Sequence, residues 1–355
     1  MSTRVSFGKP TIDFSATLRK RVDEYFASDG KRVTDSFKMY FKTFILFLIG
    51  AGVYWVMVFT NVPAWVSVPL CVIFGLDLAA IGFNVMHDGA HGSYSKKAWI
   101  NEIMAYSLNL MGGSSYMWKQ KHNVAHHSYT NVEGLDDDID IKPWIRTNES
   151  QPKYWYHRYQ HFYWAFLYGF TYLLWVYNND FKKYFTGKMG NTPLKKMSVK
   201  EHFIFWISKI VYLFLFVAIP IIKLGILKTL IGYIITSFVC GWVLSVIFQL
   251  AHVVDDVTFP LLDEKTNTLE HEWTLHQLAT TANFGTRSKI LSWFAGGLNF
   301  QIEHHLFPKI SHVHYPGISK VVKDVCKQFD IPYIEYPTLM EALRSHIAYL
   351  KLVGV

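Results

Sequence analysis

The chain has little charge and almost no cysteine. Only 17% of its 355 residues are charged, whereas soluble domains carry about a quarter, so a protein surrounded by water on all sides is not expected. Three cysteines do not make the disulfide framework of a small secreted protein, and Cys71 and Cys240 lie inside apolar runs. The first 38 residues carry eight Lys/Arg and show no secretory signal peptide. We therefore expect a membrane protein with its thiols in a reducing compartment.

Four long apolar runs are present, at residues 39–60, 64–86, 203–222 and 226–250. Each approaches the roughly 20 residues that cross a bilayer, and short turns pair them into two hairpins. A shorter, aromatic-rich run at 161–177 predicts an interfacial helix; a fifth span there would put the histidine clusters on opposite faces. The sequence thus predicts an all-α integral membrane protein with four spans, formed as a single domain over residues 1–355.

The segments outside the hairpins carry most of the positive charge. Residues 1–38, 87–200 and 251–355 hold 8, 14 and 9 Lys/Arg, whereas the turn at 61–63 holds none. The positive-inside rule therefore predicts cytoplasmic termini and a cytoplasmic cap formed by 87–200 and 251–355. The net charge of +8 indicates contact with anionic lipid rather than with nucleic acid. Residues 1–38 form either a solvated tail or a membrane-surface helix, and short amphipathic helices are expected at 318–329 and 338–350.

Seven of the 16 histidines lie in three clusters: HDGAH at 87–91, HNVAHH at 122–127 and QIEHH at 301–305. In the first two, a spacing of four residues puts two imidazoles on one helical face. His127 is rotated by about 100° along such a helix and is expected to face another partner. His252 directly follows the fourth run. Histidines alone at span ends are usually structural, but clusters gathered on one membrane face predict a metal site.

The chemistry of the ligands narrows the choice of metal ion. No cysteine lies near the clusters, and eight imidazoles exceed the needs of one zinc ion. Histidine-rich sites suit iron or copper, and the Glu-x-x-His pairs of soluble di-iron bundles are missing. Two irons sharing eight nitrogens are favoured, with neighbouring acids accepting the remaining imidazole N–H groups. These acids are Asp88, Asp136, Asp137, Asp138, Asp255, Asp256 and Glu303; a solvated loop is the alternative for residues 136–138.

The three motifs, set between two apolar hairpins, resemble those of the membrane fatty acid desaturases. Glutamine at position 301, where most members have histidine, is typical of the front-end group, which includes Δ5/Δ6 acyl and sphingolipid desaturases. The resemblance implies two iron ions on a four-span helical scaffold with a cytosolic cap. It also makes Gln301 a candidate ligand, directly or through water, and Asp88, Asp137 and Glu303 supporting acids. The implied iron ligands are His87, His91, His122, His126, His127, His252, His304 and His305.

The implied enzyme uses O2 as co-substrate and introduces a cis double bond on the carboxyl side of a long-chain fatty acyl-CoA or acyl-lipid, at Δ6 or Δ5. The chain has no His-Pro-Gly-Gly heme motif, which predicts a separate electron donor: ferredoxin, or cytochrome b5 with its reductase. It is similar to bacterial linoleoyl-CoA or acyl-lipid desaturases, so we expect a multi-pass protein of the bacterial inner membrane with a cytoplasmic active site. A hydroxylase on the same scaffold is the alternative enzyme. A non-catalytic receptor or a metal transporter is the alternative outside enzymes, although a transporter would hold its metal near mid-membrane.

Overall fold

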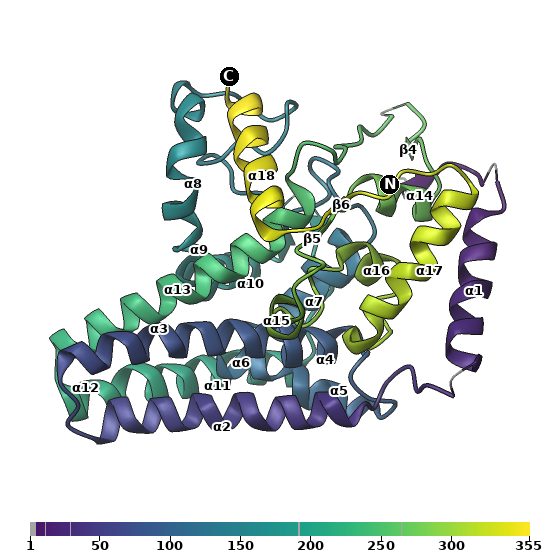
Figure 1. The fold of residues 1–355 in the computed structure, drawn as a ribbon. Helices are drawn as coiled ribbons and strands as arrows, with labels where there is room; N and C mark the ends of the chain where they lie inside the picture. Colours follow the sequence, from purple (N-terminus) through teal and green to yellow (C-terminus); the bar gives the residue numbers. More distant parts are fainter. Residues whose placement is uncertain (1–4, 11, 29, 191, 264) are drawn as a thin grey trace. The chain divides into compact units, whose positions relative to one another are not determined.

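The computed structural model describes residues 5–10, 12–28, 30–190, 192–263 and 265–355, most of them helical (Figure 1). The chain divides into two compact units. The membrane unit comprises Asp35–Gln120 and Tyr163–Val246; the histidine unit comprises Met1–Thr34, Lys121–Phe162 and Ile247–Val355. The predicted all-α class is confirmed, because strands in the described residues occur only as two-residue pairs.

The first hairpin of the membrane unit is formed by α2 (Phe37–Phe59) and α3 (Ala64–Ile81), which lie side by side (Figure 1). The turn between them ends at Pro63. Proline suits the start of a helix because its ring fixes φ near the helical value and because it has no N–H group that needs a hydrogen-bond acceptor. α3 continues through the π-helical turn η1 (Gly82–Met86) into α4 (His87–His91). The first histidine pair therefore ends a helix long enough to cross a bilayer.

The second hairpin begins with α11 (Val199–Leu213), which continues through the π-helical turn η5 (Phe214–Ala218) into α12 (Ile219–Leu224). The chain reverses at Gly225, whose φ of 83° is a conformation that glycine adopts without strain. α13 (Ile226–His252) then returns and ends at His252.

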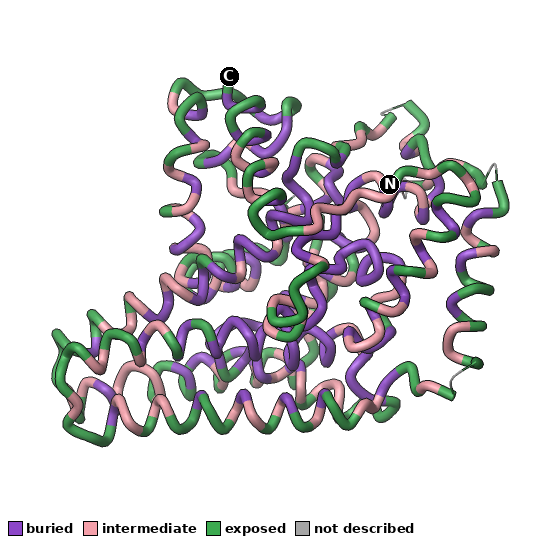
Figure 2. The backbone as a smooth tube through the Cα atoms, in the orientation of Figure 1, coloured by how far each residue is buried: buried purple, intermediate pink, exposed green. Residues whose placement is uncertain are grey.

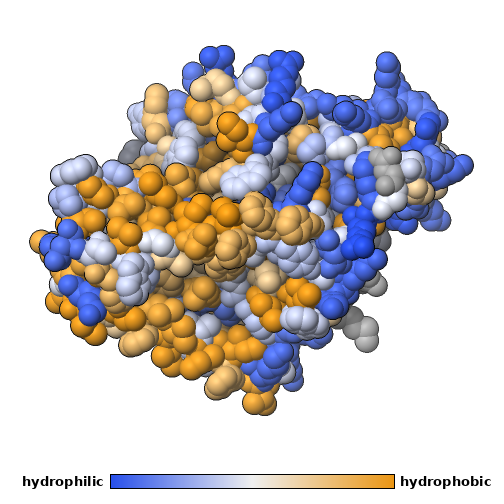
Figure 3. All heavy atoms as spheres, turned by 60° about the horizontal axis from the view of Figure 1, so that its bottom comes forward, coloured by the Kyte–Doolittle hydropathy of each residue, from blue (hydrophilic) through white to orange (hydrophobic). Residues whose placement is uncertain are grey.

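Four helices in the described residues are long and apolar enough to span a membrane: 37–59, 64–91, 199–224 and 226–252. This confirms the four predicted spans, with ends shifted by a few residues. Large apolar side chains on these helices are exposed, such as Phe44, Trp65, Phe203 and Leu230. Figure 3, in which the lower side of Figure 1 comes forward, shows a broad hydrophobic surface of this kind. Such a surface is stable against lipid and not against water.

The segment predicted as one interfacial helix at 161–177 is instead broken. α8 (Gln160–Tyr168) ends before Gly169, and α9 (Thr171–Leu174) follows and continues into η4 (Trp175–Asn179). The break lies where Gly169 closely approaches Gly241 of α13, too closely for a side chain on Gly241. The rest of the membrane unit comprises α5 (Ala98–Ala105), α6 (Ser107–Leu110), α7 (Ser115–Lys119), α10 (Asp180–Thr186) and the strand pair β2 (Lys188–Met189) and β3 (Thr192–Pro193).

The histidine unit has a core between α1 (Phe14–Ser28) and α17 (Tyr315–Gln328). Buried and exposed residues alternate along both helices (Figure 2). The unit also contains η2 (Gln120–His126), η3 (Trp155–Tyr159), α14 (Trp273–Ala279), α15 (Lys289–Phe294), α16 (Gln301–Leu306), η6 (His312–His314) and α18 (Leu339–Gly354). β1 (Ser6–Phe7) pairs with β4 (Thr268–Leu269), and β5 (Asn283–Phe284) with β6 (Glu335–Tyr336), both in parallel.

The N-terminal arm differs from one of the two expectations. α1 is not a solvated tail, because Phe14, Leu18 and Val22 are buried against α17. Their spacing of four residues places them on one helical face. α17 and α18 correspond closely to the amphipathic helices expected near the C-terminus.

We predict that Gly241→Ala destabilises the membrane unit. A Cβ at this position would lie 2.7 Å from the carbonyl oxygen of Gly169 and 2.9 Å from the amide nitrogen of Tyr172, so backbone must move. Overpacking of this kind costs about 1–3 kcal/mol. The measurement is the melting temperature of the detergent-solubilised protein. Gly52→Ala on α2 is the matched control, because no atom lies within 4 Å of its added carbon; equal melting of both variants would contradict the prediction.

A second prediction concerns acid stability. His346 is fully buried, its Nδ1 lies 2.6 Å from the carbonyl oxygen of Val253, and burial lowers its pKa to about 4. Because the unfolded chain takes up this proton near pH 6.5, stability should fall as the pH drops from 6.5 to 4, by about 3 kcal/mol from this residue. We expect His346→Asn to lose less stability than the wild type between pH 7 and pH 4.5 in thermal unfolding. Parallel pH profiles would show that His346 does not titrate in this way.

Candidate metal centre

Six of the eight predicted metal ligands lie in three segments of the histidine unit, and all six are buried. η2 and the residue after it supply three, the end of α13 supplies one, and α16 supplies two. They are His122, His126, His127, His252, His304 and His305.

A wide helical turn brings His127 back beside His122. The amide of His127 donates to the carbonyl oxygen of His122, five residues earlier, which is the π-helical pattern. The Nε2 atoms of the two rings are 3.2 Å apart. In an α-helix, His127 would be rotated by about 100° from His126; the extra residue in this turn brings it beside His122 instead.

His126, His252 and His305 form the first cluster. One ligand atom from each lies within 4.8 Å of the others. The Nδ1 atoms are engaged elsewhere: that of His126 lies 2.8 Å from Asp136 Oδ2, that of His305 lies 2.7 Å from Gln277 Oε1, and that of His252 lies 3.3 Å from the Thr280 carbonyl oxygen. Since each Nδ1 proton has an acceptor, each Nε2 carries the lone pair and can bind a metal.

These residues fit a bound metal ion. In the described part of the chain, the Nε2 atoms of His126 and His252 are buried without a hydrogen-bond partner. A buried polar atom left in this state costs about 1–3 kcal/mol, and three imidazole nitrogens within 4.8 Å of one another are a common arrangement for a transition metal.

The second cluster consists of His122, His127 and His304. The ring centroids of His127 and His304 are 4.6 Å apart, and those of His122 and His304 are 6.1 Å apart. The Nδ1 of His122 lies 2.7 Å from Asp138 Oδ2, and that of His304 lies 3.2 Å from the hydroxyl of Tyr315. The Nδ1 atoms of His122 and His304 are therefore held in the same way as those of the first cluster, and the Nε2 atom of His122 lies 3.2 Å from that of His127.

Two carboxylates set the electrostatics of η2. Burial disfavours the charged form of His126, but Asp136 outweighs this effect and raises the histidine pKa. The pKa of Asp136 is lowered in return, again against the effect of burial. Asp138 has a pKa well below its usual range, because Lys121, with Nζ 2.6 Å away, and His122 outweigh its burial. Both acids therefore stay ionised and accept imidazole protons; Asp137 lies between them.

α16 also buries Gln301 and Glu303. The Oε1 atom of Gln301 has no hydrogen-bond partner among the described residues, so its amide oxygen is a plausible ligand. Glu303 accepts from Asn283 Nδ2 at 2.8 Å and from the hydroxyl of Tyr333 at 2.9 Å, and burial raises its pKa to about 8. Its carboxyl thus ties α16 to the segments around β5 and β6.

The membrane unit holds the remaining pair. The rings of His87 and His91 lie 4.6 Å apart, and Trp118 packs edge-on against both at 5.5 and 5.7 Å. Asp88 is buried, with Oδ1 3.8 Å from Nδ1 of His87. This distance is too long for a hydrogen bond.

Comparison with known proteins identifies the protein family to which this chain belongs. A family model described as fatty acid desaturase matches residues 63–337. The chain belongs to the fatty acid desaturase family. It is 41% identical over 350 residues to an acyl-lipid (8-3)-desaturase of Physcomitrium patens, covering 97% of this chain and 72% of that protein. Sn-1 linoleoyl-lipid 6-desaturases of Arthrospira platensis and Synechocystis sp. are each 34% identical, covering 100% and 96% of this chain and 96% and 95% of their own lengths.

The predicted resemblance to front-end desaturases is therefore confirmed, and the protein is an oxidoreductase of fatty acid metabolism. Family membership also excludes the non-catalytic receptor and the metal transporter as readings of the histidine clusters. With its four apolar helices, this desaturase is an integral membrane protein.

Three acceptors of imidazole protons were not anticipated from the sequence: Gln277, Tyr315 and the carbonyl of Thr280. Two lie in α14 or just after it, and one begins α17. None of them lies within a histidine motif, and the pairing of His305 with Gln277 spans 28 residues. No local pattern pointed to them.

We predict that Asp136→Asn and Asp138→Asn weaken metal binding by the desaturase. An amide accepts the imidazole proton less strongly than a carboxylate, and loss of such a partner typically lowers metal affinity about 10–100-fold. The measurement is metal retained by the purified protein against a graded chelator. Asp140→Asn is the control, because the Asp140 carboxylate pairs with Lys142 at 2.7 Å. Equal retention in all three variants would show that these acids do not support a metal.

Proposed function

We propose that this desaturase introduces a cis double bond at Δ6 or Δ5 of a fatty acyl chain carried by a membrane lipid, at a centre of two iron ions. The observation that carries the proposal is the convergence of buried imidazoles with their Nδ1 protons already accepted. Relatives named sn-1 linoleoyl-lipid 6-desaturase, aligned over nearly their whole length, support the lipid carrier and the position of the bond.

The histidine unit offers the nitrogens for most of the proposed iron coordination, as His126, His252 and His305 in one cluster and His122, His127 and His304 in the other. His87 and His91 complete the set of eight. The chain itself supports their inclusion: Trp118, which packs on both rings, stands four residues before His122 in one continuous helical segment. Gln301 is proposed as a further ligand, directly or through water.

Bound iron supplies the chemistry that side chains lack: O2 and two electrons with two protons become two waters as two hydrogens leave adjacent methylenes. The chain positions the metal and protects it. Asp136, Asp138 and Gln277 hold imidazole protons at Nδ1, so Nε2 stays directed inward. Burial of the clusters excludes bulk water from the reacting groups.

Electrons come from a separate carrier in this proposal, either ferredoxin or cytochrome b5 with its reductase. The excess of Lys and Arg outside the hairpin turns supports cytoplasmic termini and a cytoplasmic metal centre, in a bacterial inner membrane.

The test is expression in a host without polyunsaturated lipids, supplied with linoleate or a C20 trienoate. We expect a new double bond at Δ6 or Δ5, located by mass spectrometry, and enriched in lipids hydrolysed by an sn-1-specific lipase. The same cells should yield purified protein with two iron ions per chain. His126→Ala should form no product, because it removes a nitrogen of the first cluster.

Two outcomes would contradict the proposal. A hydroxy fatty acid without a new alkene would indicate a hydroxylase on the same scaffold. A new double bond found only in acyl-CoA pools, before any appears in glycerolipids during a pulse of labelled substrate, would exclude the lipid carrier.

A further inference from the structure

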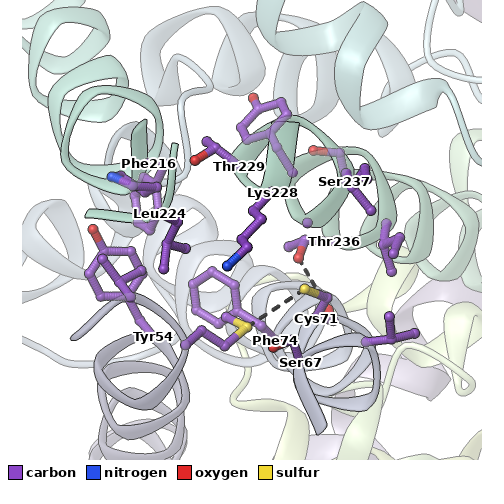
Figure 4. A pocket seen from close by; sticks show the side chains of 18 of the residues that line it. Tyr54, Ser67, Cys71, Phe74, Phe216, Leu224, Lys228, Thr229, Thr236 and Ser237 are labelled. Atoms are coloured by element: carbon purple, nitrogen blue, oxygen red, sulfur yellow. Dashed lines mark hydrogen bonds between the residues drawn. The ribbon is translucent and has the colours of Figure 1, made fainter. Parts of the chain in front are cut away.

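The membrane unit contains a large cavity at the end opposite its histidines. Its volume is about 440 Å³, and its walls come from α2, α3, α9, α11, η5, α12 and α13 with the turn between α2 and α3. Figure 4 shows side chains of these segments arranged around it. Cavities of roughly 300–1,000 Å³ accommodate small-molecule ligands.

The cavity is polar at one end and apolar further in. Thr60, Asn61 and Lys228 line it at the hairpin turns. Deeper in the unit it is lined by Leu78 and Met111, and by Tyr172 and Tyr212, whose hydroxyl groups are hydrogen-bonded to each other. Along α3, the lining runs from Ala64 to Leu78, about 21 Å of helix axis. A ligand that matches this gradient has a polar head and a long apolar tail.

Lys228 defines the charge of the head. In Figure 4 its amino group extends into the cavity, toward Phe74. None of the ion pairs found among the described residues includes Lys228. The neighbouring Lys223 differs, because its ammonium lies over the ring of Phe59 at 5.7 Å and it does not line the cavity. Lys228 is exposed, so it stands at the mouth of the cavity, and a cation beside a mostly apolar cavity favours an anionic partner.

We propose that this cavity binds a single-chain anionic amphiphile, with its carboxylate or phosphate at Lys228 and its acyl tail running past Cys71 toward Met111. Cys71 and Gly232 line the middle of the path, where a Cβ on Gly232 would lie 3.3 Å from the Cys71 sulfur. α3 and α13 therefore pack closely at this level, and the tail lies along the cavity wall that these two residues form.

The Lys228 end of the cavity is far along the helix axis from the histidine pair of the membrane unit, and the proposal does not rest on the proposed function. α3 and its continuation place His87 23 residues after Ala64, about 35 Å along the helix axis. That length is comparable to the hydrocarbon thickness of a bilayer. A head held at Lys228 therefore lies near the membrane surface opposite the one that carries the histidine pair. The tail of this ligand runs toward the histidine side, whereas the tail of a substrate with its head on the histidine side runs away from it.

The experiment uses the full-length protein in lipid nanodiscs and a photoreactive C16 fatty acid with a diazirine near its methyl end. After irradiation, peptide mapping locates the label. We expect label in peptides covering residues 64–78 and 228–237, with unlabelled palmitate competing. Palmitoyl lysophosphatidic acid is a second competitor: the better of the two identifies carboxylate or phosphate as the head, and either result supports the proposal. Labelling is scored whether or not the preparation desaturates.

Matched variants distinguish recognition of the charged head from nonspecific hydrophobic binding of the acyl tail. Lys228→Met should weaken labelling of these peptides by about 10–100-fold, as expected when a charge-assisted hydrogen bond is lost, and Lys223→Met should leave it unchanged. Gly232→Leu fills the middle of the cavity and should abolish the labelling while the protein still elutes as a single species. Hexadecanol, with the same chain and no charge, should compete poorly.

Competition by hexadecanol equal to that by palmitate, together with unchanged labelling of Lys228→Met, would overturn the proposal and leave a pocket for acyl tails alone. Label found only in peptides that carry the histidine motifs would overturn it as well, because the fatty acid would then occupy the desaturation site.

Discussion

The metal centre depends on one repeated interaction, the hydrogen bond that takes the proton from each imidazole Nδ1. Asp136, Asp138, Gln277, Tyr315 and a backbone carbonyl provide it for five rings of the histidine unit. Without these acceptors, an imidazole could rotate or change tautomer, and its Nε2 would not be directed inward. Burying so many polar rings is unfavourable unless their second nitrogen is also satisfied, and a metal ion satisfies several of them at once.

Charge is divided between the units in a way that suits this centre. The histidine unit contains 21 Lys/Arg and 21 Asp/Glu, so the whole net charge of +8 belongs to the membrane unit. Exposed lysines at 182, 188, 195, 196 and 200 precede or begin α11, where anionic headgroups attract them. Near the clusters, by contrast, Asp136 pairs with His126 and Asp138 pairs with Lys121. Local pairs there set the protonation state, and bilayer electrostatics acts on the other unit.

Features that depend on a local sequence pattern, such as an apolar run or a motif, were predictable from the sequence. Features that depend on contacts between distant segments were not. The four spans followed from apolar length, and the three histidine motifs with Gln301 pointed to the family. The packing of α1 on α17 was missed because its apolar face, Phe14, Leu18 and Val22, is short and flanked by charge, so either lipid or protein can cover it. Gln277 and Tyr315 were missed for a related reason: only tertiary packing brings them to His305 and His304.

The π-helical turn at η2 explains why a motif with three histidines in six residues can serve one compact centre. In an α-helix, His122 and His126 share a face while His127 points elsewhere. Here the bond from the His127 amide to the His122 carbonyl adds one residue to the turn, and the two rings meet with Nε2 atoms 3.2 Å apart. Such a turn gives up regular α-helical hydrogen bonds and persists only where tertiary contacts compensate. Trp273 and Gln277 supply them, since both donate to the carbonyl oxygen of His127. The same Gln277 accepts the proton of His305, so one side chain holds the distorted turn and orients a ligand on another helix.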